Sequence, residues 1–187
     1  MEINLKIRNI EIETFLLIGE IKNDKILTNL KNYIKNNIDN SWKLKTHVKG
    51  DFTGFTKLLE TPYFLDFLNC IKKEIKIVYP NNFYVKEAWG NVCNLNEEVT
   101  EHNHKGINAF CGILYLSEGG PGTYFKDYDL TVDEKIGRFI LFHPFLMHRV
   151  NKIDKNIERI TMAFNMQEIT KWDWEKFNTP DNKMIQF

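Results

Sequence analysis

The sequence predicts a mainly β protein of the α+β class, in which helices of the first half cover one sheet of a β-sandwich or barrel. Two patterns predict this fold. Before Pro80, two segments carry apolar residues at helical spacing. From there to about residue 167, short strand-like segments alternate with glycine-rich turns such as SEGGPG and KIGR. Many short strands separated by such turns are typical of sandwiches and barrels.

Residues 1–80 are expected to form a supporting region of one strand and two helices. Residues 3–21 alternate as a strand does, and residues 23–38 repeat apolar side chains at helical spacing behind a start signal at Asn23 and Asp24.

The second helix is expected over residues 61–78. Thr61 suits the N-cap because its hydroxyl can accept a free backbone N–H, and Pro62 suits the first helical position.

Six strands are expected in the core region, residues 81–167. They are residues 83–95, 99–104, 107–117, 122–130, 137–143 and 157–166. The charged stretch 126–136 is interpreted as a solvated loop, with a lid over a binding site as the alternative. The tail, 168–187, shows no clear period, and Trp172 and Trp174 are expected to pack outside the barrel. All of residues 1–187 are expected to form a single domain.

Composition favours a soluble cytoplasmic protein. The apolar fraction of 43% and the charged fraction of 27% are ordinary for soluble chains. The formal net charge is zero, so no broad nucleic-acid or anionic-membrane footprint is expected, and no apolar run is long enough to span a membrane. Three scattered cysteines indicate reduced thiols. The partner we expect is a small molecule or a peptide, and no pattern specifies an oligomeric state.

Three of the five histidines are candidate metal ligands. His102 and His104 stand two residues apart, and on a strand this spacing directs both side chains to one face. Neutral imidazole is a common metal ligand. His148, 44 residues after His104, follows a probable strand and supplies a third. The alternative is an ordinary polar pair on a strand. His143 is expected to be structural or to face substrate, and His47 to lie on the surface.

Arg159 lies on an otherwise apolar strand. Arg159, Thr161 and Ala163 share one face of this segment. Burying an unpaired charge is expensive, and a guanidinium group grips a carboxylate through paired hydrogen bonds. Either a bound carboxylate, a protein carboxylate or solvent must therefore satisfy Arg159.

Taken in their order along the chain, the histidine and arginine motifs and their neighbours resemble those of the 2-oxoglutarate and Fe(II)-dependent oxygenases, especially a compact bacterial and phage branch related to prolyl hydroxylases. The matching motifs are WGN (89–91), HNH (102–104), CGILYLSEGGPGTYF (111–125), GRFILFHPFLMHRV (137–150) and ERITMAFN (158–165). They cover roughly the last half of the chain. In that family an arginine follows the distal histidine by about ten residues; here the interval is eleven. The resemblance implies a double-stranded β-helix, a jelly-roll or cupin-like barrel.

The resemblance also implies a reaction and its site. Fe(II), 2-oxoglutarate and O2 would hydroxylate an amino acid, peptide or small metabolite and release succinate and CO2. The implied metal ligands and catalytic residues are His102, His104 and His148. The implied co-substrate contacts are Arg159, Thr161, Tyr115 and Asn91. For Tyr115 a barrel-lining aromatic is the alternative, and for Asn91 a turn residue.

One position departs from most of the superfamily, which has a carboxylate where this chain has His104. Three neutral imidazoles leave Fe(II) with its full charge, which the 2-oxoglutarate dianion can balance. Alternatively, Asp127 or Asp129, or less readily Glu101, completes the triad and His104 lies beside the ligands.

Two other functions are compatible with the histidines. One is a cupin-type three-histidine iron dioxygenase that does not use 2-oxoglutarate, which has no need of an anchor at Arg159. The other is a non-catalytic metal- or ligand-binding β-barrel.

Overall fold

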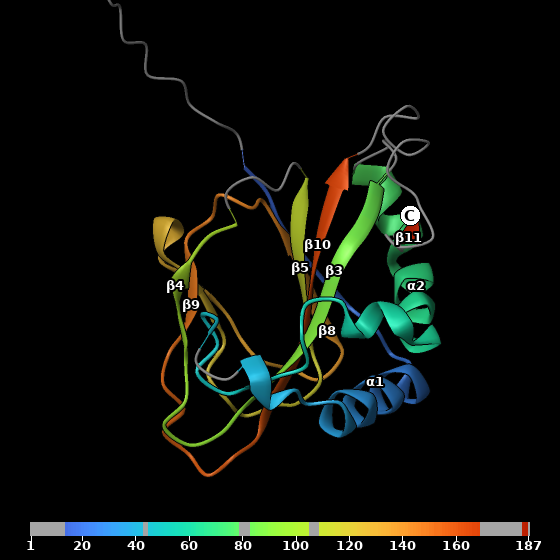
Figure 1. Cartoon of the computed structure of the whole chain (residues 1–187). Coiled ribbons are helices and arrows are strands. Elements are labelled where there is room, and N and C mark those ends of the chain that lie inside the picture. The colour runs from blue at the N-terminus through green and yellow to red at the C-terminus, as the bar shows by residue number, and fades with distance from the viewer. Residues whose placement is uncertain (1–13, 43–44, 79–82, 105–108, 169–184, 187) are drawn as a thin grey trace, which may run out of the picture.

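Two antiparallel β-sheets face each other, and two α-helices cover the outer side of the larger sheet (Figure 1). The computed structural model describes residues 14–42, 45–78, 83–104, 109–168 and 185–186. No helix in these ranges combines the length and apolar character that crossing a membrane requires.

The larger sheet has β10 near its centre. In the described residues its order is β1–β8–β5–β10–β3–β11, and β2 pairs separately with β3. The strands are β1 (Leu16–Glu20), β2 (Asp51–Phe52), β3 (Phe83–Cys93), β5 (Phe110–Tyr115), β8 (Arg138–Phe142), β10 (Arg159–Glu168) and β11 (Ile185–Gln186).

The smaller sheet contains the strands that alternate with these along the chain. Its order is β4–β9–β6–β7, formed by Val99–His102, His148–Val150, Thr123–Phe125 and Leu130–Val132. From β3 to β10 the chain thus passes repeatedly between the sheets. This alternation is the double-stranded β-helix, so the predicted fold class is confirmed.

Both predicted helices form and begin where their capping residues indicate. Helix α1 spans Asp24–Asn36, and the Oδ1 atom of Asn23 accepts a hydrogen bond from the N–H of Ile26 at 3.2 Å. Helix α2 spans Pro62–Val78, behind Thr61, whose hydroxyl accepts from a backbone N–H. Short 3₁₀ helices, η1 (Asn40–Trp42) and η2 (Lys57–Glu60), lie between them.

The two faces of β10 have different environments. Ile160, Met162 and Phe164 point outward into the core shared with α1 and α2, whereas Arg159 and Thr161 point inward, between the sheets. Burying each large apolar side chain contributes about 1.5–3 kcal/mol, so the outward face holds the helices in place. The inward face is thereby left free to line a cavity.

Close packing explains the glycine of the WGN motif. A Cβ atom added at Gly90 would lie 2.4 Å from a side-chain carbon of Ile34, on α1. Helix α1 can therefore approach β3 closely only because residue 90 has no side chain.

Some local expectations were wrong. The strand predicted over 122–130 is broken into β6 and β7 by a 3₁₀ turn, η3 (Lys126–Tyr128), and the stretch 126–136 is therefore not simply a loop. The turn is fixed by Asp129, which adopts a left-handed conformation with φ of 47°. Residues 3–13, Trp172 and Trp174 lie outside the described residues.

Candidate functional site

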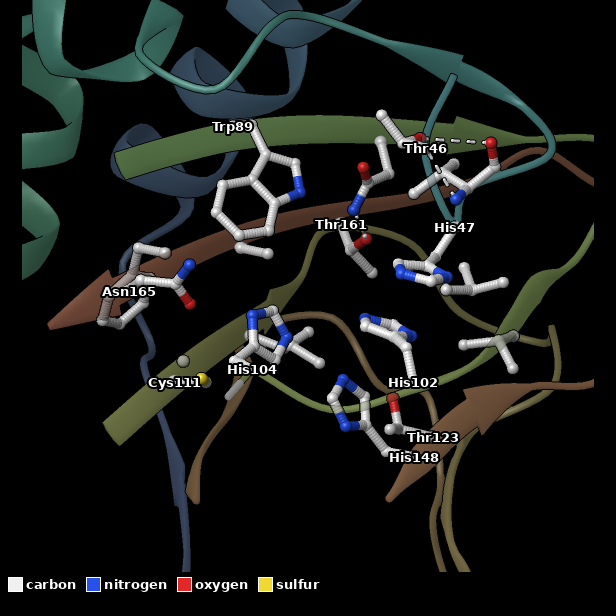
Figure 2. A pocket seen from close by; sticks show the side chains of 18 of the residues that line it. Thr46, His47, Trp89, His102, His104, Cys111, Thr123, His148, Thr161 and Asn165 are labelled. Carbon is white, nitrogen blue, oxygen red and sulfur yellow. Dashed lines mark hydrogen bonds between the residues drawn. The ribbon is translucent and has the colours of Figure 1, made fainter. Parts of the chain in front are cut away.

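A cavity of about 300 Å³ lies between the inner faces of the two sheets. Histidines from the smaller sheet meet polar side chains of β3 and β10 there (Figure 2). Phe52 and Phe55, from the segment before α2, form an aromatic wall with Trp89. A cavity of this size is at the small end of the roughly 300–1,000 Å³ of ligand-binding pockets.

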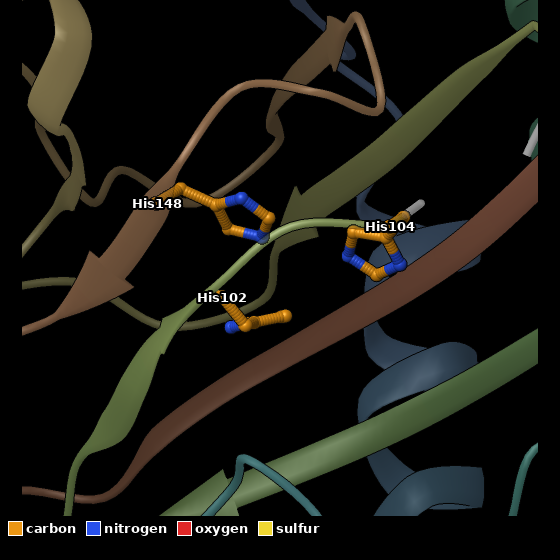
Figure 3. Close-up of side chains that lie close together, drawn as sticks. All are labelled: His102, His104 and His148. Atoms are coloured by element: carbon orange, nitrogen blue, oxygen red, sulfur yellow. The ribbon is translucent and has the colours of Figure 1, made fainter. Parts of the chain in front are cut away.

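His102, His104 and His148 converge on one point of this cavity (Figure 3). One nitrogen from each ring lies within 4.8 Å of the others, so the three could hold one metal ion. His102 ends β4 and His148 begins β9, and the two residues are paired across the sheet.

His104 reaches this point by another route than expected. Strand β4 ends at His102, so strand alternation does not place His104. Instead its backbone N–H donates to the carbonyl oxygen of Pro144 at 2.8 Å, and this bond joins the segment after β4 to the connection between β8 and β9.

Backbone carbonyls orient two of the rings. The Nδ1 atom of His102 lies 2.8 Å from the carbonyl oxygen of Thr100, and Nδ1 of His148 lies 2.9 Å from that of Leu146. A carbonyl only accepts, so each Nδ1 carries the proton. The lone pair of Nε2 is then available to a metal.

Burial keeps all three rings neutral at physiological pH. It lowers the pKa of His102 and of His104 to about 4, and that of His148 to about 3. The proximity of the other imidazoles lowers the pKa of His148 further. Neutral imidazole is the form that binds metal, so no proton has to leave the site first.

These pKa values predict that the metal-free protein loses stability as the pH falls below about 6.5. Unfolded imidazoles take up protons near pH 6.5, whereas the buried rings resist until about pH 4. Protonation therefore favours unfolding by roughly 1.4 kcal/mol per pH unit for each ring. Urea unfolding between pH 7 and 5 measures this slope. His143→Asn should leave the slope unchanged, because His143 does not line the cavity. An equal slope in His148→Asn would contradict the prediction.

The carboxylates considered as alternative ligands are engaged elsewhere. Asp127 accepts from the N–H of Met147 at 3.2 Å, and Asp129 from the hydroxyl of Tyr124 at 3.0 Å. Glu101 pairs with Lys126 at 2.8 Å and also with an arginine. Within the described residues, the group that could hold a metal contains no carboxylate.

Arg159 lies at one end of the cavity, and its side chain is buried, with 2% of the residue exposed. Its Nε donates to the carbonyl oxygen of Pro121 at 3.0 Å, and the guanidinium lies 5.5 Å from the centre of the Tyr115 ring. Across the described part of the chain, no carboxylate pairs with it and its terminal nitrogens make no hydrogen bond. The site therefore presents a buried positive charge without an anion.

Thr161 and Asn91 lie beside this charge on adjacent strands. The Asn91 Nδ2 atom donates to the hydroxyl of Thr161 at 3.3 Å, which leaves the hydroxyl proton of Thr161 free for an acceptor. Asn91 is buried and its Oδ1 is unpartnered.

Tyr115 is fully buried behind Arg159 rather than at the cavity surface. Its hydroxyl lies 2.7 Å from the hydroxyl of Thr123, which does line the cavity. Direct contact between Tyr115 and a co-substrate stays a prediction.

Sequence reasoning missed several residues of the cavity, among them three with polar side chains. His47 is exposed, as expected, but it also stacks on His102, with ring centres 4.3 Å apart. Glu87 and Asn165 line the end of the cavity away from Arg159. Strand alternation could have found these two, because Asn165 shares the inward face of β10 with Arg159. No local pattern marks His47.

The chain is similar to known proteins in its structure but matches none by sequence. No family model matches the chain, and no curated protein matches it. Viral collagen prolyl hydroxylase from Paramecium bursaria Chlorella virus-1, solved with 2-oxoglutarate, aligns with a TM-score of 0.62 at 12% identity over 83% of this chain and 96% of that one. A Pseudomonas putida prolyl-4-hydroxylase aligns at 0.62, with 10% identity over 83% and 93% of the two chains. HygX from Streptomyces hygroscopicus, solved with nickel, 2-oxoglutarate and hygromycin B, aligns at 0.63, with 11% identity over 82% of each chain. At such identities the likeness shows a shared fold.

Proposed function

We propose that this chain is a 2-oxoglutarate-dependent non-haem iron dioxygenase that hydroxylates an amino acid, peptide or small metabolite. One observation carries the proposal. Three neutral imidazoles converge in the same cavity as a buried guanidinium that lacks an anion. The solved structures of this fold described above include enzymes with 2-oxoglutarate bound, which supports the proposal.

The three histidines fit a divalent iron. Imidazole nitrogen suits iron, nickel and zinc, and three ligands from one side leave positions open for other molecules. His102, His104 and His148 would hold the ion, each through one nitrogen. Three neutral ligands do not reduce the charge of the ion, so an anionic co-ligand is favoured.

The far end of the same cavity fits a dicarboxylate. Arg159 would pair with the carboxylate that points away from the metal, and Thr161 would donate its hydroxyl proton to it. Asn91 would orient this hydroxyl by donating to its oxygen through Nδ2, and direct contact between Asn91 and the co-substrate stays a prediction. Tyr115 would hold the guanidinium in place through its ring.

When bound, iron, 2-oxoglutarate and O2 would together oxidise a C–H bond, with succinate and CO2 as by-products. The residues of this chain would position the reactants and reduce the access of water to the cavity. Phe52, Phe55 and Trp89 form an apolar wall beside the histidines, and such walls strengthen polar interactions by lowering the local dielectric.

The alternative functions account for fewer observations. A three-histidine dioxygenase without 2-oxoglutarate leaves the buried Arg159 unexplained, because substrate would bind the metal directly. A non-catalytic metal-binding barrel explains the histidines but gives no reason to retain an unpaired charge in the same cavity.

Turnover assays test the proposal. Protein loaded with Fe(II) in air should convert 2-oxoglutarate to succinate, slowly without substrate and faster when a substrate is present. Metal-free protein and Zn(II)-loaded protein serve as controls. The proposal would be contradicted if iron-loaded protein formed no more succinate than these controls, both without substrate and with every candidate substrate tested.

Thr161→Val is expected to weaken 2-oxoglutarate binding about tenfold or more without changing metal affinity. The substitution keeps the shape of the side chain and removes one hydrogen bond to a charged group, which contributes about 1.5–3 kcal/mol. Calorimetric titration of the nickel-loaded protein measures the change. Thr131→Val, at an exposed position on β7, is the matched control. Unchanged binding would remove Thr161 from the co-substrate site.

A further inference from the structure

The cavity has a second polar end, which the proposed co-substrate does not use. Arg159 and Asn165 both line the cavity and are six residues apart on β10, roughly 20 Å at about 3.3 Å per residue. Between them the neighbouring strands place Trp89 and Ile113 opposite Ala163. Figure 2 shows His104 on the Asn165 side of the histidines and His102 on the Thr161 side. The metal position thus lies between two different polar ends.

The second end presents acceptors that have no donors. Asn165 is buried, with 5% exposed, and its Nδ2 donates to Oε2 of Glu87 at 2.8 Å. A carboxylate only accepts, so this bond fixes the amide with its oxygen turned away from Glu87. That oxygen has no partner. In the described residues no cation pairs with Glu87, and its Oε1 atom accepts no hydrogen bond.

The negative charge of Glu87 acts on a neighbouring side chain and is not neutralised by a cation in the described residues. Burial raises the pKa of the neighbouring Cys111 thiol above its ordinary value, and the negative charge of Glu87 raises it further. Cys111 lies opposite Asn165 on β5. The buried oxygen of Asn165 costs free energy while it has no donor, so a bound group that brings N–H donors would be stabilised there. A positive charge on that group would also pair with the half-buried carboxylate of Glu87.

We propose that Glu87 and Asn165 recognise a cationic nitrogen of the substrate, an ammonium or guanidinium group carried on a slim apolar stem. The inference rests on the proposed function and names its substrate class. The ammonium group offers three donors, enough for the free carboxylate oxygen and the amide oxygen together. The stem would pass along Trp89, toward the histidines. A cavity of about 300 Å³ that also holds a co-substrate excludes a bulky group.

The two ends would then sort their ligands by charge. The anion-binding end at Arg159 takes the dicarboxylate, and the cation-binding end at Glu87 rejects it, because a second anion there would face an unneutralised carboxylate. The arrangement therefore fixes which molecule lies on which side of the metal.

A set of size-matched probes tests this inference. The nickel-loaded protein with 2-oxoglutarate, which does not turn over, is titrated with n-pentylammonium chloride, 1-pentanol and sodium pentanoate at pH 7 and low salt, and binding is followed by calorimetry and ligand-observed NMR. We expect pentylammonium to bind at least tenfold more tightly than pentanol, and pentanoate to bind most weakly. In Glu87→Gln the preference for pentylammonium over pentanol should fall below twofold.

The controls separate this inference from the proposed function. Glu158→Gln removes the same charge at the surface, where Glu158 pairs with Lys35, and should keep the tenfold preference. A metal-free titration should also keep it, because the metal is not part of this subsite. Equal binding of amine and alcohol, or a preference that survives Glu87→Gln in folded protein, would overturn the inference. Failure of nickel and 2-oxoglutarate to bind, with the amine preference intact, would count against the proposed function alone.

Discussion

Arg159→Met is expected to give a folded protein that binds metal normally but binds 2-oxoglutarate at least a hundredfold more weakly. The guanidinium is the buried cation at that end of the cavity, and removing one partner of a buried charge pair costs about 2–5 kcal/mol. At about 1.4 kcal/mol for each factor of ten, the middle of this range exceeds a hundredfold. Calorimetric titration of the nickel-loaded protein with 2-oxoglutarate measures the loss.

The same substitution should stabilise the ligand-free protein. In the described residues Arg159 has a carbonyl oxygen and an aromatic ring as partners but no carboxylate. A buried charge without a counter-ion costs free energy, and an apolar side chain of similar length removes that cost. Urea unfolding of ligand-free protein measures this effect. Arg149→Met, at a partly exposed arginine that pairs with Glu101, should change neither quantity appreciably. A hundredfold loss of metal affinity in Arg159→Met would mean that the anchor assignment is wrong.

His148→Ala is expected to lower the affinity for a divalent metal more than about a hundredfold. Even changes to groups behind metal ligands cost about 10–100-fold, and His148 offers a ring nitrogen directly. Competition with a chromophoric chelator measures the affinity for Fe(II) under argon and for Zn(II) in air. His143→Ala should keep full affinity, since that ring lies outside the group of three.

His104 decides between two forms of the site. His104→Ala should lower metal affinity as His148→Ala does, whereas His104→Asp should restore much of it, because a carboxylate at this position is the usual ligand of the resembled family. Unchanged metal affinity in His104→Ala would show that another group completes the triad. That result would contradict the three-histidine site that the convergence of the rings indicates.

The features that sequence predicted well are those with a local physical cause. Capping by Asn23 and by Thr61 fixed the starts of both helices, because each satisfies a backbone N–H within a few residues. Alternation along β10 separated Arg159 and Thr161 from the outward apolar side chains, because strand geometry repeats every two residues.

The features that sequence did not predict depend on contacts between distant segments. His104 reaches the other rings through a backbone bond to Pro144, not through a strand. His47 stacks on His102 because residues 47 and 48 pair with the backbone of β4, and nothing in their own sequence indicates this pairing. The 3₁₀ turn that divides the strand predicted over 122–130 depends on the left-handed backbone of Asp129. The spacing of apolar residues does not indicate such a conformation.

The most direct test of the central account is an anaerobic titration of the Fe(II)-loaded protein with 2-oxoglutarate, followed by visible absorption. Three histidine ligands and an Arg159 anchor predict a weak charge-transfer band that saturates at one equivalent in the wild type. At the same concentrations the band should be lost in Arg159→Met, although iron remains bound. A protein that holds one equivalent of iron and shows no band, or shows the same band without Arg159, would contradict the account.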